Sequence, residues 1–281
     1  MKPGDIVDVY KTRFKKLLKH YHNLLEAFDP NDIHHFRLEI KKIRAFLHLV
    51  YIESGDHHSK ISKDFTMLYS LSGNIRNLQL HGTRIRGLCK DLLLEIPAVY
   101  LQYLNEEEKV LKNQIRQMAK NISVKYFENK LIEEVPRKLT RRMQNDFIQK
   151  NIARFNELFA LSFHADEALH EIRKIMKDLM YNFKYLREAE IANALPGLQG
   201  LKSMNTTITI LGDYHDLCIS LSLINSTYVI EITDADEAHV LNELKIQLQV
   251  RKDVMRIEII EMLKGLSQNI LSKETPTPLP Q

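Results

Sequence analysis

Apolar residues recur at intervals of three and four along most of this chain, which is the period of an amphipathic α-helix. Four prolines, at positions 30, 97, 136 and 196, separate long segments in which this pattern continues. We expect Asp32 and Asp166 to cap the N-termini of two helices. The pattern predicts helices near 7–28, 33–53, 59–72, 75–95, 105–122, 138–161, 165–192, 199–211, 214–224 and 236–266.

Two β-branched segments interrupt this picture. Thr206–Ile210 and Thr227–Ile232 have the local composition of strands, but no other strand is available to pair with them. We expect tertiary context to make the first segment helical and the second to be the end of a helix. The sequence therefore predicts one all-α domain over residues 1–272, followed by a disordered, proline-rich tail at 273–281.

Composition excludes several classes of protein. The 281 residues are 44% hydrophobic and 27% charged, which is typical of a globular chain with a core. Only nine glycines are present, and neither GxGxxG nor GxxxxGK[ST] occurs, so a glycine-rich phosphate loop is excluded. No apolar segment approaches the roughly 18 residues of a membrane span, and the N-terminus lacks the apolar core of a signal peptide. We expect a cytoplasmic protein without a membrane partner.

Cysteine usage bears on the compartment of the protein, and charge distribution bears on its partner. Cys89 and Cys218 lie far apart without a CxxC motif, which fits a reducing compartment. The net charge is only +4, but residues 109–154 hold twelve basic and four acidic residues, whereas residues 228–281 hold six basic and nine acidic. This asymmetry suggests a polyanionic partner.

An internal repeat carries the candidate chemistry. IHHFRLEIKKIRAFLHLV starts at Ile33, and LHEIRKIMKDLMYNFKYL starts 136 residues later at Leu169. On a helical wheel each copy places a basic stripe, about 80° wide, beside an apolar stripe. The first basic stripe consists of His34, Arg37, Lys41, Arg44 and His48, and the second of His170, Arg173, Lys177 and Lys184, with Met180 as the exception.

The basic stripe has two other interpretations, a solvated bundle surface and a metal site. Long basic side chains often border an apolar face merely because their stems pack there, so a solvated bundle surface is one alternative. No carboxylate shares either stripe, and this repeated absence favours a function. A metal site is disfavoured because arginine and lysine lie one turn from His34 and His170. We therefore expect no metal ligand, no cofactor and no catalytic residue.

An anion fits the stripe, because arginine, lysine and protonated histidine donate well to phosphate oxygens. Each stripe is about 21 Å long, which suits a linear polyanion better than a single phosphate. In a phosphate-lined groove the histidines should favour their charged form, so we expect tighter binding near pH 6 than near pH 8.

Four motifs resemble those of the CHAD family, the conserved histidine α-helical domain. IHHFRLEIKKIR and LHEIRKIMKDLMY are similar to its two His/Arg signatures, and LSGNIRNLQL and LGDYHDLCI to its recurring LGxxRDxDV and LGxxxD elements. The resemblance implies two pseudo-symmetric, four-helix-bundle-like halves, about 1–135 and 136–272, around a basic central groove that binds inorganic polyphosphate.

The resemblance also implies a set of phosphate contacts: His34, Arg37, Lys41, Lys42, Arg44, His170, Arg173, Lys174 and Lys177. His48 and Lys184 join this set from the stripes, and Arg76 from the third motif. Lys41 and Lys42 stand where the family has arginine, Met180 replaces another arginine, and Asn77 and Gln79 replace two acids. Seven further basic residues are candidates for the groove walls: Arg13, Lys15, Lys19, Arg137, Arg141, Arg142 and Arg154.

We therefore predict non-enzymatic binding of inorganic polyphosphate, with storage, regulation and recruitment to polyphosphate granules as open roles. RNA binding is the first alternative, but it favours aromatic stacking platforms that the stripe lacks. A phosphohydrolase is the second, and it needs carboxylates to hold Mg²⁺, for which only Asp213 and Asp216 are candidates. A purely structural protein is the third.

Overall fold

The computed structural model describes residues 3–53, 63–134, 136, 138–162, 165–187, 189–191, 200–225 and 235–271. All regular structure within these residues is helical and none is strand, so the predicted all-α class is confirmed. The elements are α1 (Pro3–Ala27), α2 (Pro30–Val50), α3 (Lys63–Leu92), α4 (Ala98–Ala119), α5 (Val124–Glu134), α6 (Arg141–Ser162), α7 (Asp166–Asn182), the 3₁₀ turn η1 (Phe183–Tyr185), α9 (Gly200–Ile224) and α11 (Ala235–Leu271).

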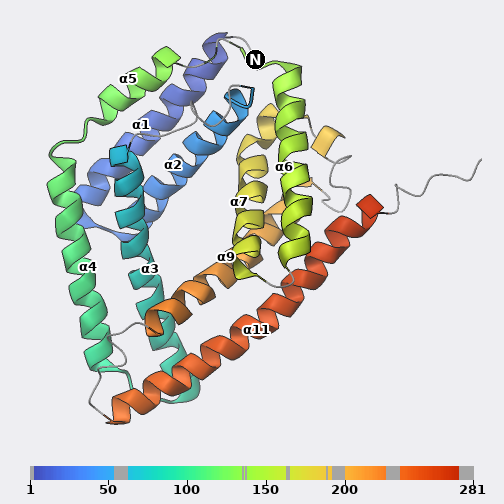
Figure 1. Ribbon diagram of the computed structural model, residues 1–281. Coiled ribbons are helices and arrows are strands. Elements are labelled where there is room, and N and C mark those ends of the chain that lie inside the picture. The colour runs from blue at the N-terminus through green and yellow to red at the C-terminus, as the bar shows by residue number, and fades with distance from the viewer. Residues whose placement is uncertain are drawn as a thin grey trace, which may run out of the picture.

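The helices pack in an order that occurs twice along the chain. α1 packs on α2, α2 on α3 and α3 on α4, and in the same way α6 packs on α7, α7 on α9 and α9 on α11. The two sets meet where α2 packs on α7 and α3 on α9. In Figure 1, α11 runs along the lower edge of the molecule from the ends of α3 and α4 towards α6. The division into two four-helix bundles around a groove stays a prediction.

Two groups of buried apolar residues hold these helices together. The larger group includes Phe14 of α1, Phe36 of α2 and Met176 of α7. The smaller group lies where α3 and α9 end and α4 and α11 begin, and it includes Tyr100 and Leu244. Burial of apolar area at these two places fixes how α2 and α7, the two repeat helices, lie relative to α3 and α9.

Two pairs of predicted helices are in fact single helices. α3 (Lys63–Leu92) runs through both segments predicted at 59–72 and 75–95, and α9 (Gly200–Ile224) runs through both segments predicted at 199–211 and 214–224. Gly73 and Gly212, where we expected breaks, are buried inside these helices against arginine side chains. A glycine costs about 1 kcal/mol in a helix interior, and tertiary packing around these two offsets that cost.

Other boundaries also differ from the prediction. α4 begins directly after Pro97 and not near residue 105, and α7 ends at Asn182, ten residues before the predicted limit. The buried amide of Asn182 donates to Ala45 O of α2 at 2.7 Å, which holds this end of α7 in place. The pattern did not predict the short helix α5, which packs its Phe127 ring on Phe65 at 4.6 Å.

The predicted caps were wrong by one to three residues. Asp29 caps α2 by accepting from Asn31 N at 2.8 Å, with Pro30 as the first helical residue. Ala165 precedes α7, and Asp166 is its first residue. The carboxylate of Asp32 accepts instead from His20 and Asn23 of α1, each at 3.1 Å.

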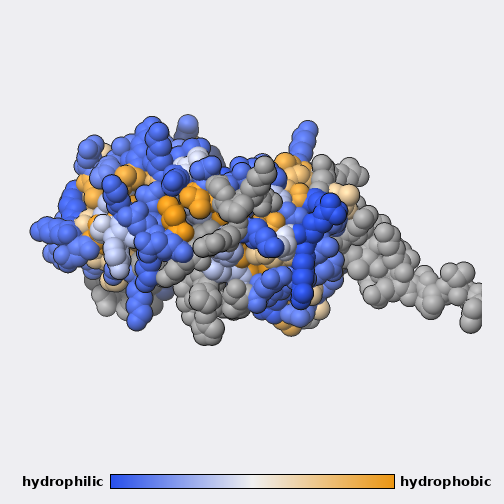
Figure 2. Space-filling view, turned by 90° about the horizontal axis from the view of Figure 1, so that it is seen from above, coloured by the Kyte–Doolittle hydropathy of each residue, from blue (hydrophilic) through white to orange (hydrophobic). Residues whose placement is uncertain are grey.

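Thr206–Ile210 lies within α9, so the expected override of its strand propensity is confirmed. Thr227–Ile232 and the tail at 273–281 lie outside the described residues. Seen from above, the surface is mainly hydrophilic, and hydrophobic residues show in small separate groups (Figure 2). None of the described helices has the length and apolar character needed to cross a membrane.

Candidate anion site

The two repeat helices, α2 and α7, pack against each other. Their predicted apolar stripes are almost entirely buried: Phe36, Ile40 and Leu47 on α2, like Ile172 and Leu179 on α7, are fully inaccessible to solvent. Because the basic stripe lies beside the apolar stripe on each helix, this packing brings basic residues of the two copies close together.

Four side chains form the centre of this arrangement. They are Arg37 and Lys41 of α2 and Arg173 and Lys177 of α7, which we call the cation cluster. Burial lowers the pKa of Lys41 to about 7, and the other three cations of the cluster act in the same direction. Burial lowers the pKa of Lys177 to about 8, helped by the charges of Arg173 and Arg37. Like charges that depress each other's pKa values form a strong site for an anion.

A carboxylate lies within electrostatic reach of the cluster. Asp216 of α9 raises the pKa values of Lys41 and Lys177, although it offsets only part of the lowering. The backbone carbonyl of Asp216 accepts from Arg84 of α3 at 2.7 Å, which fixes this part of α9. From the sequence, Asp216 was a candidate only as a metal ligand. Among the described residues, no group of three or more His, Cys, Asp or Glu side chains could hold a metal ion.

The guanidinium of Arg37 packs closely against α3. Its Nη1 donates to the carbonyl oxygen of Tyr69, and its guanidinium carbon lies 4.1 Å from the centre of the Tyr69 ring. A Cβ at position 73 would lie 2.8 Å from the same guanidinium carbon, so only the glycine there leaves room for Arg37. The guanidinium is therefore held before any ligand arrives.

Arg173 occupies the corresponding place in the second copy, against Gly212 of α9. The Nη2 atom lies 3.2 Å from where a Cβ of residue 212 would be. In contrast to Arg37, Arg173 has a buried Nε without a hydrogen-bond partner among the described residues, and the same holds for Nδ1 of His170. Buried donors of this kind are costly unless an acceptor reaches them, and phosphate oxygens are suitable acceptors.

Three histidines lie near the cluster. Partial burial, together with the charge of Arg76, lowers the pKa of His34 to about 4. Burial also lowers the pKa of His170 to about 4, next to His215, whose ring centre is 4.1 Å away. These two rings line a cavity of about 260 Å³ together with the carboxylates of α7. Burial likewise lowers the pKa of His215 to about 4, so at neutral pH all three histidines are uncharged without a ligand.

His215 and Tyr69 were not among the predicted site residues. His215 follows Gly212 by three residues, just as Arg76 follows Gly73, so aligning the two LG motifs on their glycines would have found it. Tyr69 precedes its motif and carries no sequence signal, because only the packing of α3 on α2 brings it to Arg37.

The other predicted site residues lie at the edge of the cluster or away from it. Arg44 lies over the Tyr69 ring, and Arg76 is close enough to affect the pKa values of His34 and Arg37. Lys42 pairs with the buried Glu39 at 2.9 Å, on another face of α2. Lys174 pairs with Glu171 at 2.6 Å, and the exposed Lys184 lies over the Tyr185 ring.

The seven additional basic residues are not placed at the cluster. Arg13 pairs with Glu39 at 3.3 Å, and Arg154 with Glu157 at 2.9 Å. Lys15 and Lys19 of α1 and Arg141 and Arg142 of α6 are exposed, and Arg137 lies outside the described residues.

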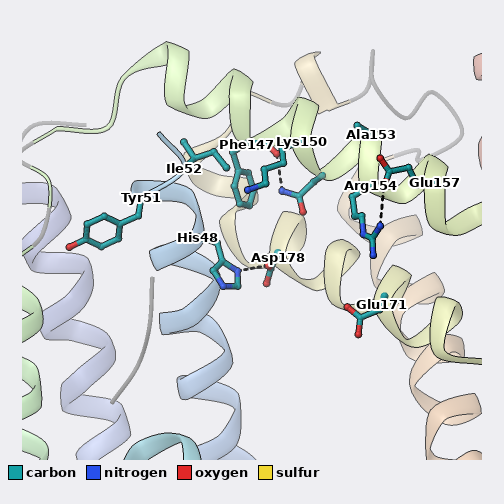
Figure 3. A pocket seen from close by; sticks show the side chains of 11 residues that line it. His48, Tyr51, Ile52, Phe147, Lys150, Ala153, Arg154, Glu157, Glu171 and Asp178 are labelled. Carbon is teal, nitrogen blue, oxygen red and sulfur yellow. Dashed lines mark hydrogen bonds and ion pairs between the residues drawn. The ribbon is translucent and has the colours of Figure 1, made fainter. Parts of the chain in front are cut away.

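His48 lies at a separate cavity of about 600 Å³ between α6 and the pair α2 and α7. Figure 3 shows its ring turned towards Asp178 of α7, to which Nδ1 bonds at 2.7 Å. Lys150 and Arg154 line this cavity, but three carboxylates do so too, and no member of the cation cluster does. The charges of this cavity are mixed, so it differs in character from the cation cluster.

Comparison with known proteins places this geometry in a family. No curated protein sequence matches the chain. A structure of the CHAD domain from the plant Ricinus communis superposes with a TM-score of 0.65 at 13% identity, over 94% of this chain and 91% of that one. PptA from Streptomyces chartreusis gives a TM-score of 0.63 at 12% identity, over 94% of this chain and 99% of that one. The CHAD domain model matches residues 9–225, so this chain belongs to the CHAD domain family.

Proposed function

We propose that this chain binds inorganic polyphosphate at the cation cluster and its flanking histidines. The observation that carries the proposal is the convergence of Arg37 and Lys41 of α2 with Arg173 and Lys177 of α7, where burial and the neighbouring cations lower the pKa values of both lysines. Phosphate oxygens would relieve this repulsion and supply acceptors for Arg173 Nε and His170 Nδ1. The CHAD family is itself associated with polyphosphate.

A linear polyanion suits the arrangement better than a single phosphate. Along α2, Arg44 lies beyond the cluster in one direction and His34 in the other, where the charge of Arg76 of α3 acts on His34. From His34 to Arg44 the helix rises about 15 Å, which is the length of several phosphate units. Each ionised contact contributes about 1.5–3 kcal/mol before desolvation and ordering costs are subtracted.

We further propose that binding is non-enzymatic and takes place in the cytoplasm. Asp216 faces lysines, and its backbone is held by Arg84, which suits a counter-ion better than a metal ligand. The two cysteines are free thiols, as a reducing compartment would keep them.

The test is a titration with long-chain polyphosphate at two salt concentrations. Wild type is compared with Arg37→Ala/Arg173→Ala and with a matched control, Lys125→Ala/Lys130→Ala, which removes two exposed charges from α5. We expect salt-dependent binding that falls by about 100-fold in the first variant and by less than about threefold in the control. Equal losses in both would indicate diffuse attraction to residues 109–154, and no wild-type binding would overturn the proposal. Displacement by RNA at equal phosphate concentration would favour the nucleic-acid alternative.

A further inference from the structure

Tyr69 is the one residue of α3 whose ring meets two guanidinium groups of α2. The guanidinium carbon of Arg37 lies 4.1 Å from the ring centre, and that of Arg44 lies 4.5 Å from it. These arginines are seven residues apart, which is about 10 Å along the helix axis, so both side chains lean towards the same ring. Arg37 also donates to the carbonyl oxygen of Tyr69, and the same oxygen accepts from Ser72 Oγ at 3.0 Å.

We propose that Tyr69 is a positioning residue for polyphosphate, acting through Arg37 and Arg44 without touching the ligand. This inference rests on the proposed function. An arginine with its face on an aromatic ring keeps the N–H groups at its edge free, and those groups are the ones that bind phosphate oxygens. Among the described residues Arg44 has no hydrogen bond or ion pair, so the ring is what orders it.

The ring makes binding tighter by ordering these side chains in advance. Arginine has many rotamers, and fixing them when the ligand binds costs free energy that an already ordered arginine does not lose. The second copy has no equivalent of this contact between one ring and two arginines. Met180 stands where the first copy has Arg44, and Ile208, four residues before Gly212, stands where the first copy has Tyr69. The ordered pair of arginines is therefore a feature of the first copy.

The same contact bears on the RNA alternative. Tyr69 is an aromatic ring beside the basic residues, which is the feature that the stripe lacks in sequence. Two guanidinium groups already lie on it, so it is not free to stack on a base.

The test uses Tyr69→Leu and Tyr69→Phe in the full chain, with Tyr126→Leu as the matched control. Tyr126 is 70% exposed on α5, away from the cluster. Long-chain polyphosphate is titrated at several salt concentrations, and the melting temperature of each variant is measured. We expect Tyr69→Leu to weaken binding about 5- to 20-fold, while Tyr69→Phe and the control stay within about twofold of wild type. The slope of log Kd against log salt should not change, because no charge is removed.

A variant background separates positioning from general support of the fold. In Arg37→Gln/Arg44→Gln, the further change Tyr69→Leu should have no effect, because the groups it positions are gone. Tyr69→Met is measured beside Tyr69→Leu, so that the result does not depend on the stability of one variant. Wild-type affinity in both Tyr69→Leu and Tyr69→Met would overturn the role of Tyr69. So would a loss on adding Tyr69→Leu to the double-glutamine variant that equals its loss in wild type. Neither result would overturn the proposed function. Failure of wild type to bind overturns the proposed function itself.

Discussion

Gly73 of α3 lies directly against the guanidinium of Arg37 of α2, so closely that a Cβ would come within 2.8 Å of the guanidinium carbon. Gly212 of α9 and Arg173 of α7 repeat this relationship at a wider separation, with 3.7 Å from the Cβ position to the guanidinium carbon. Both glycines come from LG motifs, and both arginines from the His/Arg signatures. The two kinds of motif thus meet in space, and each glycine makes the room that its arginine needs.

Gly73→Ala should separate stability from binding. Alanine is favoured over glycine in a helix interior by about 1 kcal/mol, which compensates for the displaced arginine, so the melting temperature should stay within a few degrees of wild type. The new methyl group pushes Arg37 away from Tyr69, and we expect polyphosphate affinity to fall about 5- to 20-fold. Gly87→Ala, with open space around it on the same helix, is the control and should bind like wild type. Unchanged binding in Gly73→Ala would remove Arg37 from the contact set.

Polyphosphate affinity should fall as the pH rises through the lysine pKa values. Without ligand the pKa values are lowered to about 7 for Lys41 and about 8 for Lys177, whereas bound phosphates would raise both. Above these values each lysine must take up a proton on binding, and affinity falls by up to about tenfold per pH unit for each. We expect a loss of at least about tenfold between pH 6.5 and pH 9, measured by titration at constant ionic strength.

Lys41→Gln/Lys177→Gln is the control for this dependence. It should bind more weakly at pH 6.5 and show a flatter profile from pH 7 to 9. The same steep profile in this variant would assign the dependence to other groups. The sequence predicted tighter binding near pH 6 than near pH 8 through the histidines. With pKa values near 4 in the free protein, His34 and His170 are neutral before binding in this range, so a histidine contribution would appear as the pH dependence that remains in Lys41→Gln/Lys177→Gln.

Asp216→Asn should strengthen binding. The carboxylate raises the pKa values of two lysines of the cluster and would repel a polyanion placed there. Removing its charge should raise polyphosphate affinity by about three- to tenfold at pH 6.5, as measured by competition against wild type. Asp213→Asn removes a carboxylate that is exposed on the same helix, and we expect less than about a twofold change. Equal gains in both variants would indicate only an effect of net charge.

The sequence predicted correctly those features of the site that depend on a single helix. Spacing along a helix fixes which face a residue occupies, so the wheel brought Arg37, Lys41, Arg173 and Lys177 to the correct stripes before the packing of α2 on α7 was known. It also placed Lys42 off the stripe, although the family resemblance included it, and Lys42 does pair with Glu39 on another face.

What the sequence lacked was the contribution of other helices. Tyr69 reaches the site from α3, and His215 and Asp216 reach it from α9, through contacts that only tertiary packing creates. The uninterrupted course of α3 and α9 through Gly73 and Gly212 has the same cause. Helix propensity predicts a break at each glycine, but each is buried against an arginine that requires it.

Asp166→Asn should destabilise the attachment of α11, which lies beyond the residues matched by the CHAD model. The Asp166 carboxylate accepts from Tyr214 Oη at 2.6 Å and pairs with Lys252 at 2.5 Å and with Arg256. Burial alone would raise its pKa, but these partners outweigh burial and lower it. We expect a loss of about 2–3 kcal/mol in the free energy of unfolding at pH 7, measured by urea denaturation.

A lowered native pKa contributes stability above the unfolded value of about 3.9, and this contribution is lost as the pH falls through the native pKa. The difference from wild type should therefore shrink towards pH 3, whereas Glu157→Gln, which affects an exposed pair, should change stability by less than about 0.5 kcal/mol at either pH. A loss for Asp166→Asn that is the same at pH 3 and pH 7 would show that the ionised carboxylate is not what holds α11.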